Sequence, residues 1–472
     1  MSALPERWAT ARLADVAEVR LGRQRSPKNA TGDRMRPYLR AANVKWDGLH
    51  LSDVNEMAFT EAESETYELR PGDLLLGEAS GSPSEVGKPG QYKGEIDGCC
   101  FQNTLLRVRL PDGLRPDFYE HYFREQALNG KFAAGSRGVG IHHLGAAALW
   151  DWKIPVPPRS EQERIVTAIE EAFSKLDAGE AGLRTVRLLL KRMREAVLAA
   201  AVTGRLVPQD CTDTSASTLL TGLGIVSATR DALPNGWAQA RVGDVARVGS
   251  GTTPQRGNTA YWRDGTVPWV TSGLITRGII AEAREFVTLR AVSETSLQLW
   301  PVGSLLVAMY GEGQTRGRCA ELRIEATCNQ ACAAIVLHDD LRPYKDFVRL
   351  FFDANYTANR RLASGGVQPN LNAGLIKDMI LELPPLEEQA RVVAEVERQF
   401  SFIEACEHAV GAGLARAAAL RRSVLKSAFE GQLVPQDPSD EWAFALLERI
   451  RAERAASDRA SGGRRRRKMG AS

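Results

Sequence analysis

The chain contains 472 residues, of which 43% are hydrophobic and 25% are charged, and its formal net charge is +3. This composition is typical of a globular protein large enough for about three domains, and it neither requires nor excludes a nucleic-acid partner. No run of about 18 apolar residues occurs, and the first residues lack an apolar segment. We therefore expect a cytoplasmic protein without a transmembrane helix or a signal peptide.

Residues 1–153 combine short apolar runs with turns marked by glycine. Examples of such runs are Asp73–Gly77 and Asn103–Leu110, and a helix is predicted over Asp117–Ala127. This mixture predicts a first, strand-rich domain that contains both strands and helices.

Residues 154–210 change to a helical pattern. Ser160 and Glu163, which follow two prolines, have the spacing of a capping box that begins a helix. Apolar residues then recur every seven positions, which predicts about five heptads of coiled coil. They are Ile169, Leu176, Leu183, Leu190 and Val197, with Ala172, Val186, Met193 and Ala200 in the second heptad position. Gly179 and Gly182 predict a soft point in this helix.

The rest of the chain repeats this order. Residues 211–230 are rich in Ser, Thr and Gly and are predicted to be a linker, and residues 231–380 resemble the first domain in texture. Residues 381–437 repeat the helical pattern, with Val396, Ile403, Val410 and Val424 in register. Residues 438–472 are predicted to contain a C-terminal helix and a disordered basic tail that includes Arg464–Lys468.

The second half is an internal repeat of the first. Residues 154–220 recur at 381–447 with a constant offset of 227 and no insertion, and Trp8 recurs as Trp237 with an offset of 229. Two copies of one unit predict a pseudo-two-fold repeat. The predicted fold class is α+β, with two similar strand-rich domains separated by two long helices that pair antiparallel to cover their apolar stripes.

No catalytic motif is found. The nearest approach to a phosphate-binding loop, from Gly81 to Lys88, has the wrong spacing, and Pro89 stands where a hydroxyl is required. Seven cysteines without zinc-type spacing predict reduced, buried thiols, and no metal site is expected. We therefore expect a noncatalytic protein that binds no cofactor itself.

The first domain has strongly segregated charges along the sequence. Residues 20–45 contain eight basic residues against one acidic residue, whereas residues 47–68 contain seven acidic residues and no basic one. This pattern predicts a basic surface that neutralises DNA phosphates while the acidic segment points away. The alternative is a solvated loop with no ligand. The corresponding segment of the second half, Gly249–Arg263, offers arginines, glycines and polar side chains suited to base edges.

The order of these segments carries a resemblance to a known family. Pro157–Arg164 and Pro384–Arg391 share the pattern Pro-Pro-x-x-Glu-Gln-x-Arg, each at the start of a long helix. Gly251–Gly273, Phe101–Arg107 and Cys328–Cys332 also match the family, although Gly22–Pro27 departs from its Gly-Thr-Pro pattern. The chain resembles the DNA-specificity (S) subunit of type I restriction–modification systems over nearly its whole length.

The resemblance implies that each domain, as a target recognition domain, recognises one half of a bipartite, asymmetric double-stranded DNA target. The long helices would set the gap between the halves and dock two methyltransferase (M) subunits, which use S-adenosylmethionine to methylate adenine N6. Two restriction (R) subunits would use ATP and Mg²⁺ to cleave DNA. The expected source is prokaryotic. The residues expected to dock other subunits are Glu161, Gln162, Arg164, Glu388, Gln389 and Arg391.

Candidate DNA contacts are basic or polar residues in exposed, glycine-rich segments. In the first domain they are Arg23, Arg25, Lys28, Arg40, Lys45, Ser80, Ser82, Lys88, Arg137, His142 and His143. In the second domain they are Gln255, Arg256, Tyr261, Arg263, Thr271, Arg277, Gln314, Arg316, Gln368 and Asn370.

Three other functions stay open. The chain could be a coiled-coil scaffold or adaptor, although a scaffold has no need of basic, glycine-interrupted loops. It could be a complete restriction–methylation enzyme, against which the missing motifs argue. It could also be the specificity subunit of a stand-alone methyltransferase without restriction.

Overall fold

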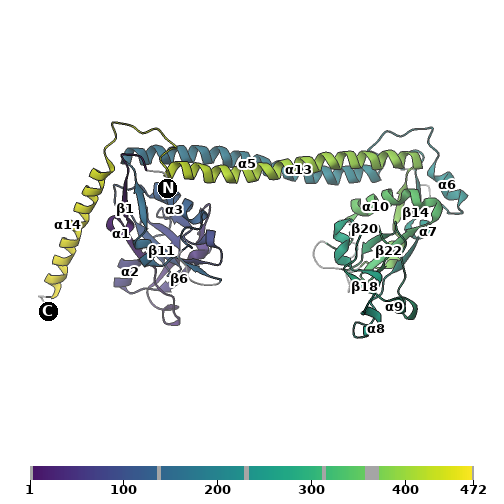
Figure 1. Ribbon diagram of the computed structural model, residues 1–472, viewed down its shortest axis with the longest axis horizontal. Coiled ribbons are helices and arrows are strands. Elements are labelled where there is room, and N and C mark those ends of the chain that lie inside the picture. The colour runs from purple at the N-terminus through teal and green to yellow at the C-terminus, as the bar shows by residue number, and fades with distance from the viewer. Residues whose placement is uncertain (1–3, 135–139, 228–232, 311–314, 357–370, 470–472) are drawn as a thin grey trace. The chain divides into compact units, whose positions relative to one another are not determined.

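The structure, a computed structural model, describes residues 4–134, 140–227, 233–310, 315–356 and 371–469 (Figure 1). The chain forms two compact units. The first unit contains residues 1–183 and 412–472, and the second contains residues 184–411. Each unit therefore consists of one strand-rich domain together with parts of both long helices, and the first unit is built from both ends of the chain.

The domain of the first unit is built on two small sheets. A four-stranded antiparallel sheet has the order β2 (Glu18–Leu21), β11 (Leu105–Arg109), β7 (Leu74–Gly77) and β9 (Pro89–Gln91). A three-stranded sheet has the order β10 (Cys100–Phe101), β3 (Met35–Leu39) and β6 (Asn55–Ala58), and β3 runs parallel to β10. The shorter pairs are β1 (Ala9–Arg12) with β13 (Lys153–Val156), β4 (Val44–Lys45) with β5 (Gly48–Leu49), and β8 (Ala79–Ser80) with β12 (His142–His143).

Helices cover these sheets and supply much of the core. The predicted helix at 117–127 is α3 (Pro116–Leu128), and its buried aromatic residues join the apolar side of the four-stranded sheet and the start of the first long helix in one core. The shorter helices of this domain are α1 (Leu13–Val16), α2 (Glu61–Tyr67), α4 (Ala146–Trp150), η1 (Pro27–Asn29), η2 (Ala41–Asn43) and η3 (Pro83–Glu85).

The domain of the second unit repeats this topology. Its larger sheet has the order β15 (Ala246–Ser250), β22 (Cys332–Leu337), β19 (Leu305–Ala308), β20 (Cys319–Leu322) and β17 (Ile279–Ile280). Its smaller sheet has the order β18 (Glu285–Val287), β16 (Val267–Val270) and β21 (Thr327–Cys328), and β16 runs parallel to β21 as β3 does to β10. The terminal pair is β14 (Ala238–Arg241) with β23 (Ile380–Leu383). The helices are α7 (Val242–Val245), α8 (Thr259–Trp262), η4 (Ser272–Arg277), α9 (Leu289–Glu294), η5 (Asp339–Tyr344), α10 (Lys345–Ala354) and α12 (Ala373–Lys377).

One close backbone approach marks the repeat at atomic detail. A Cβ atom added to Gly22 would lie 2.2 Å from the carbonyl oxygen of Gln102, and one added to Gly251 would lie 2.2 Å from that of Cys328. In each domain a glycine therefore lets the strand that leaves the larger sheet cross over the smaller sheet. The repeat predicted from the sequence is confirmed in the fold.

The two long helices are α5 (Arg159–Val202) and α13 (Leu386–Phe429), each of 44 residues. Heptad positions such as Ile169, Leu190 and Ile403 are buried, as the apolar spacing predicts. In the first unit, Arg421 contacts Asp177 while Gly413 faces Leu183, so the chains run antiparallel there. The helix α5 continues through Gly179 and Gly182, and the soft point that these glycines predict is not visible as a break.

Two segments differ from their predictions. The expected linker at 211–230 contains α6 (Ala216–Gly222), whose Ala216 and Leu220 are buried in the core of the second domain. This packing holds the polar stretch in place. The helix was not predicted because the apolar spacing of one short helix is too brief to stand out in the sequence. The helix α14 (Ala443–Met469) continues through the tail that we expected to be disordered.

Candidate nucleic-acid interface

The basic and acidic segments of the first domain are paired with each other, which contradicts the prediction that the acidic segment points away. Arg23 contacts Glu63 at 2.8 Å, Arg36 contacts Glu68 at 3.1 Å, and Arg40 contacts Asp53 at 2.6 Å. The antiparallel pairing of β3 with β6 brings the two segments together. Four of the eight basic residues at 20–45 are therefore paired with residues of the acidic segment, and the sequence alone does not reveal which strands are neighbours.

Arg23 and Arg40 are consequently structural residues in addition to being candidate contacts. The guanidinium of Arg23 also donates to the carbonyl of Ala58 at 2.8 Å and lies 5.0 Å from the centroid of the Phe59 ring. Arg25, Lys28 and Lys45 are different, because they are exposed and have no acidic side chain within 4.0 Å in the described part of the chain. These three cations remain available to a phosphate.

The loop near β8 contributes mainly polar groups. Ser82 is exposed and Ser80 is half-buried, whereas Lys88 pairs with Glu85 and lies 5.5 Å from the centroid of the Trp46 ring. His142 and His143 form β12 beside β8, and Nδ1 of His143 lies 3.2 Å from Oε1 of Glu78. The structure thus brings Ser80 and the two histidines together on the antiparallel pair of β8 and β12.

Arg256 in the second domain is held by an aromatic cage. Its guanidinium lies 4.0 Å from the Trp262 ring centroid and 4.7 Å from that of Trp269, and it pairs with Glu285. The rings of Trp262 and Trp269 meet edge to face at 5.1 Å. This cluster fastens α8 to the smaller sheet, so Arg256 has a structural role that the sequence did not reveal.

The other candidates of the second domain divide by exposure. Gln255, Arg263 and Arg277 are exposed, Thr271 and Tyr261 are half-buried, and Arg277 pairs with Glu282 at 3.1 Å. The hydroxyl of Tyr261 donates to Glu294 at 3.2 Å, and Arg316 is half-buried. The candidates that lie outside the described residues are Arg137, Gln314, Gln368 and Asn370.

Four of the six residues predicted to dock other subunits are buried within their own unit, where their side chains serve the fold. Glu161, Gln162 and Glu388 are at most 1% exposed, and Gln389 is 6% exposed. Glu388 accepts a hydrogen bond from the Trp237 indole at 3.1 Å, and Glu161 accepts one from Gln436. Burial raises the pKa of both glutamates.

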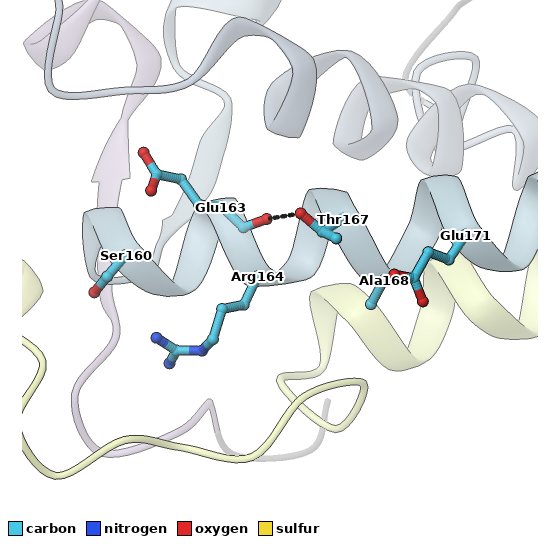
Figure 2. Close-up of a pocket in the computed structure, with 6 residues that line it drawn as sticks. All are labelled: Ser160, Glu163, Arg164, Thr167, Ala168 and Glu171. Carbon is cyan, nitrogen blue, oxygen red and sulfur yellow. Dashed lines mark hydrogen bonds between the residues drawn. The ribbon is translucent and has the colours of Figure 1, made fainter.

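The remaining two, Arg164 and Arg391, form equivalent ion pairs at the two helix starts. Arg164 contacts Asp440 at 2.6 Å, and Arg391 contacts Asp213 at 2.5 Å. Figure 2 shows Arg164 on α5, pointing away from Glu163 and toward the segment that follows α13. These residues line an open pocket of about 520 Å³ (Figure 2). Thr167 also lines it, and its hydroxyl donates a hydrogen bond to the Glu163 carbonyl at 3.0 Å. The Pro-Pro-x-x-Glu-Gln-x-Arg pattern therefore describes how a long helix is anchored to its domain.

An exposed apolar stripe on α5 was missed by the search for docking residues. Val186, Leu189 and Met193 are 40%, 54% and 37% exposed and lie three and four residues apart on one face. The heptad pattern had assigned Val186 and Met193 to the covered seam. Because they are exposed, these residues form a second apolar face of α5, separate from the buried face that packs on α13.

Several absences concern the described residues alone. Within them, no group of three or more metal-ligating side chains is found, and no helix has the length and apolar character to cross a membrane. All seven cysteines are unpaired, and five are buried as predicted, but Cys211 is exposed and Cys406 is half-buried. Burial raises the pKa of Cys99 and Cys100 to about 12, which keeps both thiols protonated.

Comparison with known proteins agrees with this architecture. The EcoKI specificity subunit of Escherichia coli (strain K12) is 27% identical over 489 aligned residues, which cover 96% of this chain and 97% of that protein. The StySPI specificity subunit of Salmonella potsdam is 26% identical over 485 residues with the same coverage of both chains.

Solved structures share the fold. The HsdS subunit from Thermoanaerobacter tengcongensis matches with a TM-score of 0.56 and 18% identity over 91% of this chain and 98% of that one. A chain from a structure described as addressing complex assembly and conformational transition of the type I R-M system matches with a TM-score of 0.65 and 18% identity over 91% of this chain and 99% of that one.

The family model of the type I restriction modification DNA specificity domain matches residues 5–183 and again residues 234–406. These ranges contain both strand-rich domains and the starts of both long helices, and they confirm the resemblance that the sequence pattern carried. The chain belongs to the family of type I restriction modification DNA specificity domains, of which it contains two copies.

Proposed function

We propose that each domain of this specificity subunit recognises one half of a bipartite, asymmetric DNA target. The observation that carries the proposal is that two domains of one topology present different side chains at equivalent places. After Gly22 the first domain uses Arg23 to close its own fold, whereas after Gly251 the second domain continues to Arg256 and its aromatic cage. Equal frameworks with unequal surfaces are what recognition of two different half-sites requires.

The proposed contacts are the exposed groups that the fold does not consume. In the first domain, Arg25, Lys28 and Lys45 would neutralise phosphates and fix the register on the duplex. In the second domain, Arg263 would do the same, and the exposed side chain of Gln255 suits an adenine edge. Arg23, Arg40, Lys88 and Arg256 would support these contacts by holding the loops.

The long helices would act as a spacer and as a platform for methyltransferase subunits. The exposed stripe of Val186, Leu189 and Met193 supports docking, because a solvent-exposed apolar face of this kind is typical of a protein–protein interface. Two methyltransferase subunits would bring S-adenosylmethionine and methylate adenine N6 after extruding the base from the duplex. Restriction subunits would add ATP- and Mg²⁺-dependent cleavage. This chain would contribute recognition and no catalysis.

The proposal is tested by mapping the methylome of a host that expresses the chain with its neighbouring methyltransferase gene, using single-molecule sequencing. The expected result is a bipartite motif with N6-methyladenine in each half, which disappears when the chain is deleted. The double variant Gln255→Ala with Arg263→Ala should relax one half of the motif and leave the other unchanged.

Arg290→Ala is the matched control, since Arg290 lies in the same domain and is 64% exposed beside Glu294. A methylation pattern that does not change on deletion, given an active methyltransferase, would contradict the proposal and favour a scaffold. A motif without any restriction of unmodified DNA would identify a stand-alone modification system.

A further inference from the structure

The second unit contains a cavity that is lined by one candidate DNA contact, Arg277, and by none of the other candidates. It has a volume of about 470 Å³ and lies between the domain and its parts of the two long helices. Arginines reach it from several elements, namely Arg194 from α5, Arg277 from η4, Arg318 next to β20 and Arg349 from α10. The aromatic rings of Tyr356 and Phe400 also line the cavity.

The charges around the cavity favour an anion. Against four arginines, the lining contains two acidic residues, Asp353 and Glu404. Arg194 already faces Glu404 at 3.7 Å, and Arg277 faces Glu282 at 3.1 Å. Burial raises the pKa of Asp353 to about 6, so this carboxylate keeps its charge at pH 7 and loses it only below about pH 6. The lining carries two more basic than acidic residues.

The Nε–H group of Arg349 has no hydrogen-bond acceptor among the described residues. Its Nε is shielded from solvent without a hydrogen bond, and among the described residues no ion pair within 4.0 Å joins its guanidinium to an acidic side chain. Asp353, one helical turn away on α10, is not within 4.0 Å of the guanidinium, although the charge of Arg349 lowers the pKa of Asp353 against the larger effect of burial. Arg349 is half-buried, but a shielded Nε–H without an acceptor is costly, and a ligand with anionic oxygens would remove that cost.

The aromatic groups add a second requirement for the ligand. Arg194 lies 4.5 Å from the centroid of the Phe400 ring, and Arg318 lies 4.8 Å from that of Tyr356. Guanidinium and ring surfaces of this kind stack on planar heterocycles. The volume is also in the range of small-molecule sites.

We propose that this cavity binds a small phosphate-bearing ligand with a planar ring, of the nucleoside monophosphate class. Arg349 would hold the phosphate oxygens, since a guanidinium matches phosphate in geometry and charge. The ring would stack beside Phe400 or Tyr356. Because the cavity joins α10 to α5 and α13, an occupied site would fasten the second domain to its helices. The proposal does not depend on which DNA sequence the domain recognises.

The test measures binding of adenosine 5′-monophosphate to the full-length chain by isothermal titration calorimetry, without DNA or methyltransferase. Adenosine and inorganic phosphate are the comparison ligands. We expect the monophosphate to bind more tightly than either part. Arg349→Met keeps the aliphatic stem but removes the charge, and it should weaken binding about tenfold or more, the loss expected for one charge-assisted contact.

Arg290→Met is the matched control, because Arg290 is an exposed arginine of the same domain away from the cavity, and its variant should bind as the parent chain does. If Arg349→Met fails to fold by circular dichroism, Ile279→Glu replaces it, since Ile279 lines the cavity, is 45% exposed and would receive a repelling carboxylate. No binding of the monophosphate at about 10 mM would overturn the proposal. Equal weakening in the Arg290 control, or an effect of Arg349→Met on DNA affinity alone, would do so too.

Discussion

Arg164 and Asp440 form a 2.6 Å ion pair although 276 residues separate them in the sequence. Arg164 belongs to the first turns of α5, and Asp440 follows the end of α13. The equivalent pair in the second unit joins Arg391, at the start of α13, to Asp213, which follows α5. Each unit is therefore closed by a segment that comes from the end of the other long helix, and the C-terminal part of the chain completes the first domain.

Breaking the Arg164–Asp440 pair should destabilise the first unit. Asp440 is 6% exposed and also accepts a hydrogen bond from Ser160, so Asp440→Asn should cost about 1–3 kcal/mol of unfolding free energy, as loss of a charged hydrogen bond does. The Arg164 hydrogen bond lowers the pKa of Asp440, so the ionised form is favoured in the folded state. The stabilisation is present above the ordinary pKa near 3.8 and is lost as the pH falls through the lowered value.

Urea unfolding between pH 3 and pH 7 measures both effects, and the variant should show a flatter acid limb than the parent. Asp15→Asn is the control, because Asp15 pairs with Arg12 at the surface and its loss should change stability by less than about 1 kcal/mol. Equal losses in the two variants would show that the Arg164 pair is no stronger than a surface pair.

Glu388→Gln should leave the second unit as stable as the parent at neutral pH, or more stable. Burial raises the pKa of Glu388, so the folded state disfavours its charged form, and stability falls as the pH rises through the region above the ordinary pKa near 4.5. Gln keeps an oxygen that accepts the hydrogen bond from Trp237, whereas Ala leaves that donor unpaired. Thermal unfolding at pH 5 and pH 7 should rank the proteins as Gln at or above Glu, and Ala lowest. A Gln variant as unstable as the Ala variant would show that the charge itself is required.

Arg256→Ala and Arg263→Ala should have different consequences. Arg256 contacts two indole rings, so its loss should lower the melting temperature of the full chain by about 2–4 °C, the shift expected for roughly 1 kcal/mol. Arg263 is exposed and should affect DNA affinity with no change in melting temperature. Differential scanning calorimetry and DNA binding by the assembled complex separate the two effects. A drop in melting temperature for both variants would mean that Arg263 is structural as well.

Removal of the three unpaired cations of the first domain should weaken DNA binding at low salt. Each of Arg25→Ala, Lys28→Ala and Lys45→Ala that removes a phosphate contact should reduce the slope of log affinity against log salt by about 0.9. The loss should be similar for specific and nonspecific DNA, because phosphate contacts carry no sequence information. Fluorescence anisotropy over a salt series is the measurement. Lys175→Ala, on the exposed face of α5, is the control, and an equal slope change there would deny these three residues a special role.

A paired insertion in both long helices should lengthen the gap between the half-sites. Four residues add about 6 Å of helix, close to two base pairs of duplex. Insertion after Lys191 in α5 together with insertion after Glu407 in α13 preserves the contact between Arg194 and Glu407. Methylome mapping reads the gap directly. An unchanged gap in a complex that still methylates DNA would refute the spacer function of the helices.

Sequence patterns predicted the parts of this fold that repeat or that are periodic. The heptads placed the two long helices within residues 154–210 and 381–437, and the structure has them at 159–202 and 386–429, since burial on one helical face imposes its own spacing on the sequence. The constant offset between the copies predicted two equivalent domains, and Gly22 and Gly251 show that the equivalence extends to backbone packing. The sequence predicted that the two domains are rich in short strands. It did not predict the order or the register of these strands, because a strand of four residues does not specify its neighbour.

The charged segments and the residues at the helix starts show what tertiary structure adds to the sequence. The sequence by itself determined that basic residues cluster at 20–45 and acidic residues at 47–68, but the pairing of β3 with β6 brings the segments together, and four basic residues pair with four acidic ones. It also determined that Glu161, Gln162 and their copies begin each long helix, whereas packing decided that these side chains face inward. The physical reason is the same in both cases: the sequence fixes which groups a segment carries, and contacts between segments far apart in the chain decide which of those groups are left for a partner.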